Sequence, residues 1–93
     1  MPKLEIGQVV YSIAGRDEGR VFIVLGIIDD NHVYISDGDL RKVSKPKKKK
    51  VKHLRETGII ANSLRKKLLS NRKVEDYEIR DYLTLLSKKE QEV

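Results

Sequence analysis

The sequence predicts an α+β protein, in which a small closed or half-closed β-barrel precedes a C-terminal pair of α-helices. The chain has 93 residues, the size of one small domain. Its first half consists of short runs rich in β-branched and aromatic residues, separated by turn formers. After residue 58, apolar residues recur at helical spacing. We therefore expect a barrel over residues 1–55 and a helical extension over residues 56–93.

Four or five short strands are expected in the first half. Residues 8–13, 20–28 and 32–36 have strand-like composition, and glycine- and aspartate-rich turns separate them. The second run is too continuously apolar for a strand with one wet face, and Gly26 allows it to bend. Residues 40–43 and 51–54 add a short fourth strand and a fifth at the edge. Several short strands around one bent strand are typical of a small barrel.

Two helices are expected in the second half. The first covers residues 59–70, and residues 71–73 interrupt the pattern. The second begins near residue 75 or 76. There Val74 and Ile79 are placed as a hydrophobic staple and Glu78 occupies the third helical position.

The charge is concentrated in one segment. Residues 1–40 carry a net charge of −4, residues 41–55 a charge of +9 with no acidic residue, and residues 56–93 a charge of +1. We expect the four consecutive lysines, 47–50, to lie in a loop that the flanking strands anchor and Pro46 stiffens. A single positive face of this kind suits the phosphate backbone of a nucleic acid. A solvated linker or a localisation-type basic patch is the alternative reading of the segment.

The composition argues against several other classes. The chain has no cysteine and only two histidines, His32 and His53, so it lacks the usual nucleophile and base pairs and is not expected to be an enzyme. The acidic turns lack the spacing of a calcium loop, and neither a metal nor a cofactor is expected. No apolar run approaches the roughly 20 residues of a membrane helix, and no secretory signal is present. We expect a cytoplasmic protein without membrane contact.

The strand region resembles a known family. The stretches GQVVY, AGRDEGR, FIV and IIDDN, in that order, resemble the KOW motif of ribosomal proteins and transcription-elongation factors. With the terminal VKHL, they are most similar to the fourteenth large-subunit protein of archaeal and eukaryotic ribosomes and to small bacterial KOW proteins. The likeness covers residues 5 to about 55 and does not extend to the helical tail.

The resemblance implies an SH3-like barrel that binds RNA, in particular ribosomal RNA of the large subunit, as part of a ribonucleoprotein. Gly15 and Gly19 belong to the KOW loop, and Gly15 is expected at positive φ. The charge pattern and the resemblance together predict these RNA-binding residues: Arg16, Arg20, Arg41, Lys42, Lys45, Lys47, Lys48, Lys49, Lys50, Lys52, His53 and Arg55.

Alternatives to RNA binding remain at this point. The chain could be a protein-interaction module in which residues 59–89 dock a partner through Ile60, Leu64 and Leu68, although such a stripe more often packs within its own molecule. Charge alone does not separate RNA from duplex DNA. Tyr11, Phe22 and Tyr34 could line an aromatic cage, but strand aromatics are more often packing residues. The sequence predicts no oligomeric state.

Overall fold

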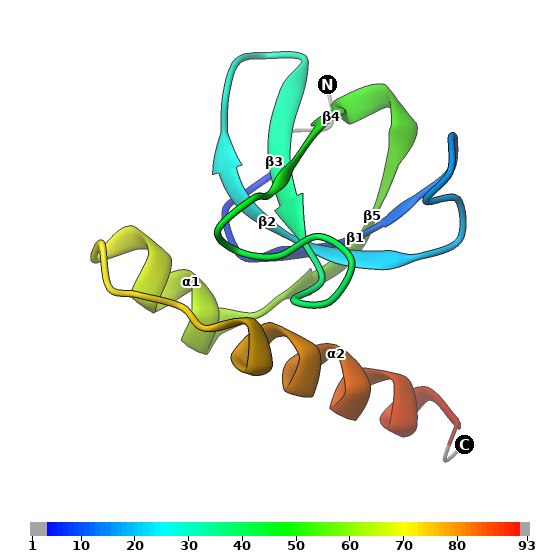
Figure 1. Cartoon of the computed structure of the whole chain (residues 1–93). Helices are drawn as coiled ribbons and strands as arrows, with labels where there is room; N and C mark the ends of the chain where they lie inside the picture. The colour runs from blue at the N-terminus through cyan, green and yellow to red at the C-terminus, as the bar shows by residue number, and fades with distance from the viewer. Residues whose placement is uncertain (1–3, 92–93) are drawn as a thin grey trace.

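The computed structural model describes residues 4–91. Five strands form one antiparallel sheet in the order β4-β3-β2-β1-β5. The sheet curls into a small barrel, and both helices lie beneath it (Figure 1). The predicted α+β fold class is therefore confirmed. The elements are β1 (Gln8–Ser12), β2 (Val21–Ile27), β3 (His32–Ser36), β4 (Lys47–Lys50), the 3₁₀ turn η1 (Val51–His53), β5 (Leu54–Ile60), α1 (Asn62–Leu69) and α2 (Asp76–Gln91).

The inside of the curled sheet is one apolar cluster. Phe22 and Val24 of β2 lie on the same face as Val10 of β1, which is directly opposite Phe22. Alternate residues of a strand point to the same face, so Phe22 and Val24 of β2 both enter this cluster, as do Val33 and Ile35 of β3. Its buried members are Val10, Phe22, Val24, Val33, Ile35 and Leu54. Because Phe22 is fully buried here, it cannot line an open aromatic cage.

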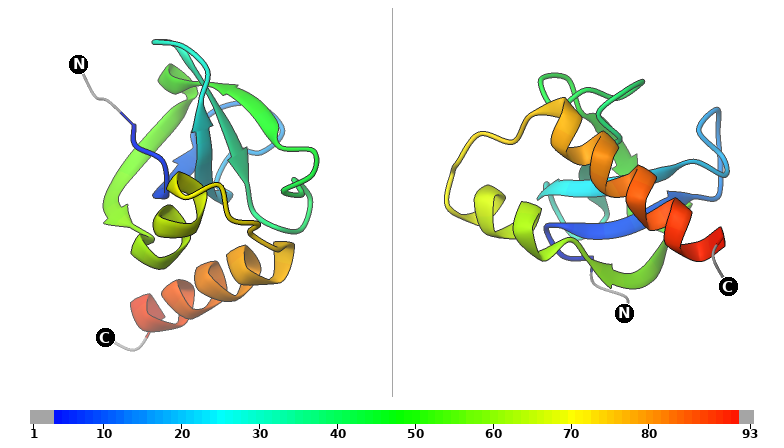
Figure 2. Two further views of the ribbon diagram at one scale, coloured as in Figure 1. Left: turned by 90° about the vertical axis from the view of Figure 1, so that its left-hand side faces the viewer. Right: turned by 90° about the horizontal axis from the view of Figure 1, so that it is seen from below.

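The outer face of the sheet is covered by the two helices. Val9 and Ile23 point to this face and are buried with Leu64 of α1 and Ile79 of α2. Seen from below, α2 crosses under the strands of the barrel (Figure 2). Leu68 packs against the same cluster. The helical tail therefore packs on the barrel, and much of the apolar stripe considered for docking a partner is used inside the molecule.

Several elements differ from the prediction, and the expected strand at residues 51–54 is one of them, because residues 51–53 form the turn η1 and the strand begins only at Leu54. Residues 40–43 form no strand, because the Asp37 carboxylate accepts the backbone N–H of Arg41 and holds this segment in a turn. β5 continues to Ile60, which pairs with Gln8, so the expected helix at residue 59 begins only at Asn62. Long-range pairing with β1 overrides the local helical spacing of these residues. β5 also runs across the expected division between residues 55 and 56.

The end of α1 and the start of α2 agree with the sequence pattern. Glu75 N–H donates to the Glu78 carboxylate at 2.8 Å, which is the capping interaction expected from their spacing, and Val74 and Ile79 are both buried. Asn71, in the predicted break, has φ +56°, and Arg72 N–H donates to the Lys67 carbonyl at 2.9 Å. This bond is the one expected where a helix ends in a left-handed residue.

Candidate nucleic-acid interface

The four consecutive lysines form a strand. The prediction of a loop was wrong, because β4 pairs with β3 through four residues, with Lys48 opposite Tyr34 and Lys50 opposite His32. Lysine has a low propensity to form strands, but β4 lies at the edge of the sheet, where lysine is common. The strand alternation divides the lysines: Lys48 and Lys50 are exposed, whereas Lys49 is only 7% exposed.

Lys49 connects β4 to the KOW loop. It lies opposite Val33, whose side chain is inside the barrel, and its Nζ donates to the Ala14 carbonyl at 2.9 Å. A buried ammonium group needs such an acceptor to offset its lost hydration. Within the described residues, Lys49 therefore serves the fold and has little surface to offer a ligand.

The KOW loop has the backbone that its glycines predict. Gly15 has φ +82°, a left-handed conformation that side chains with a Cβ rarely adopt, so the expectation for this residue is confirmed. Gly19 also has a positive φ. The exposed Arg16 lies between them, at the surface of the loop.

Two ion pairs hold this loop against the turn that follows β3. Arg20 contacts the buried Asp37 at 3.2 Å, and Arg41 contacts the buried Asp17 at 3.4 Å. Burial alone raises the pKa of Asp37. However, the N–H groups of Arg41 and Asp39 and the Arg20 guanidinium together lower the pKa of this carboxyl below its usual value. Arg20 and Arg41 are therefore already engaged with carboxylates.

The segment after β4 carries further cations. Lys52 in η1 is exposed, and Arg55 in β5 lies 5.9 Å from the centre of the Tyr11 ring. Desolvation lowers the pKa of His53, and the neighbouring ammonium groups of Lys52, Lys49 and Lys50 lower it further. The lowered pKa of His53 thus comes first from desolvation and then from the positive charge of these lysines.

The remaining predicted residues lie apart from this group. Lys42 and Lys45 are exposed in the irregular segment between β3 and β4, and Lys47 is half-buried at the start of β4.

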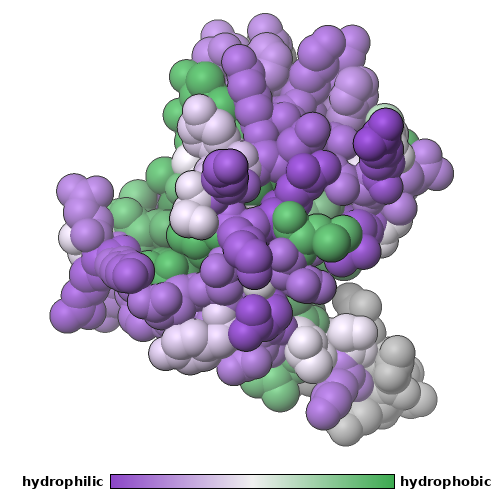
Figure 3. Space-filling view, in the orientation of Figure 1, coloured by the Kyte–Doolittle hydropathy of each residue, from purple (hydrophilic) through white to green (hydrophobic). Residues whose placement is uncertain are grey.

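The exposed cations Lys48, Lys50 and Lys52 follow one another along β4 and η1. This part of the molecule is largely hydrophilic in the view of Figure 3. We define Lys48, Lys50 and Lys52 as the basic edge.

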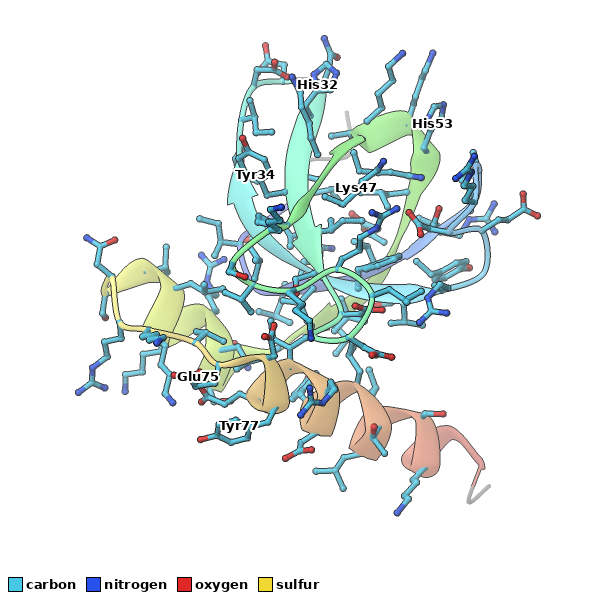
Figure 4. All side chains as sticks on the ribbon, in the orientation of Figure 1. His32, Tyr34, Lys47, His53, Glu75 and Tyr77 are labelled. Atoms are coloured by element: carbon cyan, nitrogen blue, oxygen red, sulfur yellow. The ribbon has the colours of Figure 1, made fainter. Side chains whose placement is uncertain are left out.

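The structure places further residues beside the basic edge that the charge pattern could not identify. Tyr34 is 42% exposed and lies opposite Lys48, and His32 lies opposite Lys50. Asn31 and His32, in the turn that leads into β3, line a pocket together with Lys50 and Lys52. Figure 4 shows His32 and His53 at the same end of the barrel, away from the helices. Only strand pairing places these residues beside the lysines.

Two kinds of feature are absent from the part of the chain that the structure describes. Among the side chains that the structure describes, which belong to residues 4–88, no group of three or more histidine, aspartate or glutamate residues is placed to hold a metal ion. No helix among these residues has both the length and the apolar character needed to cross a membrane.

Comparison with known proteins identifies relatives of part of the chain. No protein-family model matches it. A protein of Desulfurococcus amylolyticus named large ribosomal subunit protein eL14 is 40% identical over 57 residues, which are 61% of this chain and 59% of that protein. A protein of Staphylothermus marinus with the same name is 37% identical over 54 residues, 58% of this chain and 56% of the relative. The match thus covers less than two thirds of either relative. Over that part, the predicted resemblance to this ribosomal protein is confirmed.

Proposed function

We propose that this chain is a non-catalytic RNA-binding protein of the ribosome, or one associated with it, and that it contacts RNA phosphates through the basic edge. Two relatives bear the name of a large ribosomal subunit protein, and a component of a ribosomal subunit has ribosomal RNA and ribosomal proteins as its neighbours. A cytoplasmic location and large-subunit RNA as the ligand belong to the same proposal.

The observation that carries the proposal is the arrangement of cations along β4 and η1. Lys48 and Lys50 project from one face of an edge strand, and Lys52 follows them in η1. Because Lys49 is turned inward, the spacing of exposed charge comes from every second residue of an extended strand, about 6–7 Å apart. Counterion release favours the neutralisation of phosphates by such a row of exposed cations.

The predicted contacts differ in what they can contribute. Arg16, Lys42, Lys45 and Arg55 are exposed cations that can extend the contact beyond the basic edge. Arg20 and Arg41 would have to share their guanidinium groups with Asp37 and Asp17. We therefore assign the main phosphate contacts to the basic edge and secondary contacts to the surrounding exposed cations.

The test is a salt titration of RNA affinity. If about six phosphates are neutralised, log affinity falls with log salt concentration at a slope of about −4 to −5. Replacing Lys48, Lys50 and Lys52 with alanine should weaken binding to all RNA sequences alike and flatten the slope by about 2 to 3. The measurement is fluorescence anisotropy with fragments of ribosomal RNA.

The matched control removes the same charge elsewhere. Lys66, Arg72 and Lys88 are exposed cations on or beside the helices, away from β4, and their triple alanine variant has the same net charge. This control should keep most of the wild-type affinity. If both triple variants lost RNA affinity equally, only net charge would matter for binding. The assignment of the phosphate contacts to the basic edge would then be wrong.

A further inference from the structure

A pocket lies at one end of the basic edge. Asn31, His32, Lys50 and Lys52 line it, and its volume is about 380 Å³. It is bounded by the turn between β2 and β3 on one side and by the junction of β4 with η1 on the other. The Val51 N–H donates to the Asn31 carbonyl at 2.8 Å, and this bond joins the two sides. The pocket is therefore built by two segments about 20 residues apart in the sequence.

The two sides of the pocket carry opposite charges. The Asp29 carboxylate contacts His32 Nδ1 at 2.9 Å, so negative charge lies on the histidine side. Lys50 and Lys52 also line the pocket, and each carries a positive charge. A phosphate is repelled by Asp29 and attracted by the lysines, and so it is expected beside Lys50 and Lys52.

The side of Asn31 and His32 suits a nucleobase. The carboxylate of Asp29 favours the proton on His32 Nδ1 and fixes the orientation of the ring, which leaves Nε2 and the ring face for a ligand. The Asn31 side-chain amide offers both a donor and an acceptor, as the edge of a base requires. Unstacked bases of RNA are commonly bound by such polar groups and by stacking on histidine or aromatic rings.

We propose that this pocket takes one unstacked nucleotide of the bound RNA, with its phosphate on Lys50 and Lys52 and its base against Asn31 and His32. The proposal rests on the proposed RNA-binding function and deepens it, because the basic edge alone reads no sequence. The volume lies in the range of small-ligand pockets, roughly 300–1,000 Å³, and is larger than a phosphate group alone requires. Turn formation accounts for the Asp29–His32 contact but does not require two lysines at the pocket.

The first test is an NMR titration of the full chain with the four nucleoside 5′-monophosphates, ribose 5-phosphate and inorganic phosphate. Amide shifts should concentrate at residues 31, 32, 50 and 52. At least one nucleotide should bind about fivefold or more tightly than ribose 5-phosphate, because the base adds stacking and polar contacts. Equal affinity for nucleotides and inorganic phosphate would contradict the proposal that a nucleotide binds in this pocket. Amide shifts spread over all exposed lysines would contradict it as well.

The second test uses Asn31→Ala. The hydrogen bonds of Asn31 to Asp29 and Val51 come from its backbone, so the variant keeps the structure of the turn. Asn62→Ala, at the exposed start of α1, is the matched control. Asn31→Ala should reduce nucleotide affinity about threefold to tenfold and weaken the base preference in RNA oligonucleotides. The control should change neither.

The outcomes for RNA separate this inference from the proposed function. If wild-type protein binds RNA with the expected salt dependence but Asn31→Ala binds with unchanged affinity and base preference, the pocket proposal fails and the proposed function stands. If wild-type protein shows no salt-dependent RNA affinity, the proposed function fails. The pocket proposal then fails with it as a site for RNA, even if free nucleotides bind.

Discussion

At the scale of single residues, neighbouring lysines of the same strand have different roles. Lys48 is exposed, whereas Lys49 is buried and its Nζ donates to Ala14 O. Because side chains alternate across a strand, one residue of register decides which lysine can meet a ligand and which one supports the KOW loop.

Lys49→Ala should therefore lower stability without a matching loss of RNA affinity. We expect a loss of about 1–3 kcal/mol in the free energy of unfolding, since the charge-assisted bond disappears and the Ala14 carbonyl keeps only the Ser12 hydroxyl as a donor. Lys48→Ala should change stability by less than about 0.5 kcal/mol and weaken RNA binding instead. Urea unfolding and RNA titration of both variants check this contrast, and the opposite ranking in stability would contradict the strand register.

His53 provides a second prediction at this scale, concerning pH. Its pKa in the folded protein should lie below the ordinary value of 6.5, because of desolvation and the charges of Lys52, Lys49 and Lys50. The unfolded chain then binds the proton more readily, so protonation of His53 lowers stability as the pH falls through 6.5 and below. NMR titration of the ring protons measures the pKa.

Bound RNA should remove the part of the His53 pKa shift that the lysines cause, but not the larger part that desolvation causes. Phosphates that neutralise the nearby lysines remove the repulsion, so the pKa of His53 rises in the complex and binding takes up a proton. RNA affinity should increase as the pH is lowered from 7.5 toward 6, and His53→Gln should reduce this dependence. A pKa of His53 that is the same with and without RNA would place the phosphates elsewhere.

At the scale of elements, β4 combines two roles that its lysines can serve. It is an edge strand, and charged edge strands resist pairing with other chains. The same exposed ammonium groups form the basic edge. The two roles differ in what they require, since any charge protects an edge, whereas phosphate binding needs positive charge.

Charge reversal separates these roles. Lys48→Glu with Lys50→Glu should abolish most RNA binding but leave the protein monomeric, because the edge remains charged. Lys48→Val with Lys50→Val should weaken RNA binding and also promote self-association. Size-exclusion chromatography with light scattering, together with RNA titration, distinguishes the variants. Self-association of the glutamate variant, or full RNA binding by it, would contradict this account of β4.

The contact between α2 and the turn after β3 depends on the absence of a side chain at Gly38. A Cβ at this position would lie 2.3 Å from the Asp76 carbonyl oxygen, and Gly38 has φ +73°. The same turn is held to α2 by Asp76, whose carboxylate accepts the Val43 N–H at 2.7 Å. The start of α2 is thereby fixed against the segment that leads into β4.

Gly38→Ala should consequently destabilise the protein by about 2–5 kcal/mol, from backbone strain and steric overlap together. Gly58→Ala is the matched control, because Gly58 has a similar φ of +79° but no atom within 4 Å of its Cβ position. The control should show only the strain of about 1–3 kcal/mol. Equal losses in thermal or urea unfolding would mean that the close approach of α2 contributes nothing.

At the scale of the whole molecule, barrel and helices share one core. Val9 and Ile23 of the sheet are fully covered by a cluster that includes Leu64, Val74 and Ile79 of the tail. Removing the tail would expose the outer face of β1 and β2 to water, at the cost of the hydrophobic free energy that the contact supplies. This arrangement predicts that the sheet and the tail unfold together.

Ile79→Ala tests this coupling. The residue is fully buried, and its truncation should lower the free energy of unfolding by about 2–5 kcal/mol. The loss should appear equally in amide exchange of the most protected strand residues and in helical circular dichroism. If strand protection stayed at the wild-type level while helicity was lost, the division into residues 1–55 and 56–93 would describe two independent units.

The sequence by itself determined the features that depend on local pattern. The first three strands, the turns between them, the cap of the second helix at Glu75 and the left-handed glycine at position 15 all follow from residue types at short spacing. The concentration of positive charge in residues 41–55, and the resemblance to a ribosomal protein, are likewise properties of the sequence alone.

Tertiary structure alone decided the features that depend on distant pairing. The four lysines form a strand because they pair with β3, and β5 extends to Ile60 because it pairs with β1. The register of β4 on β3 directs Lys49 inward. It also places Asn31 and His32 beside Lys50 and Lys52. The physical reason is that a residue's role in a sheet is set by its partner strand and by the face on which its side chain falls. Neither is encoded in the local spacing of a lysine run, where every position is chemically the same.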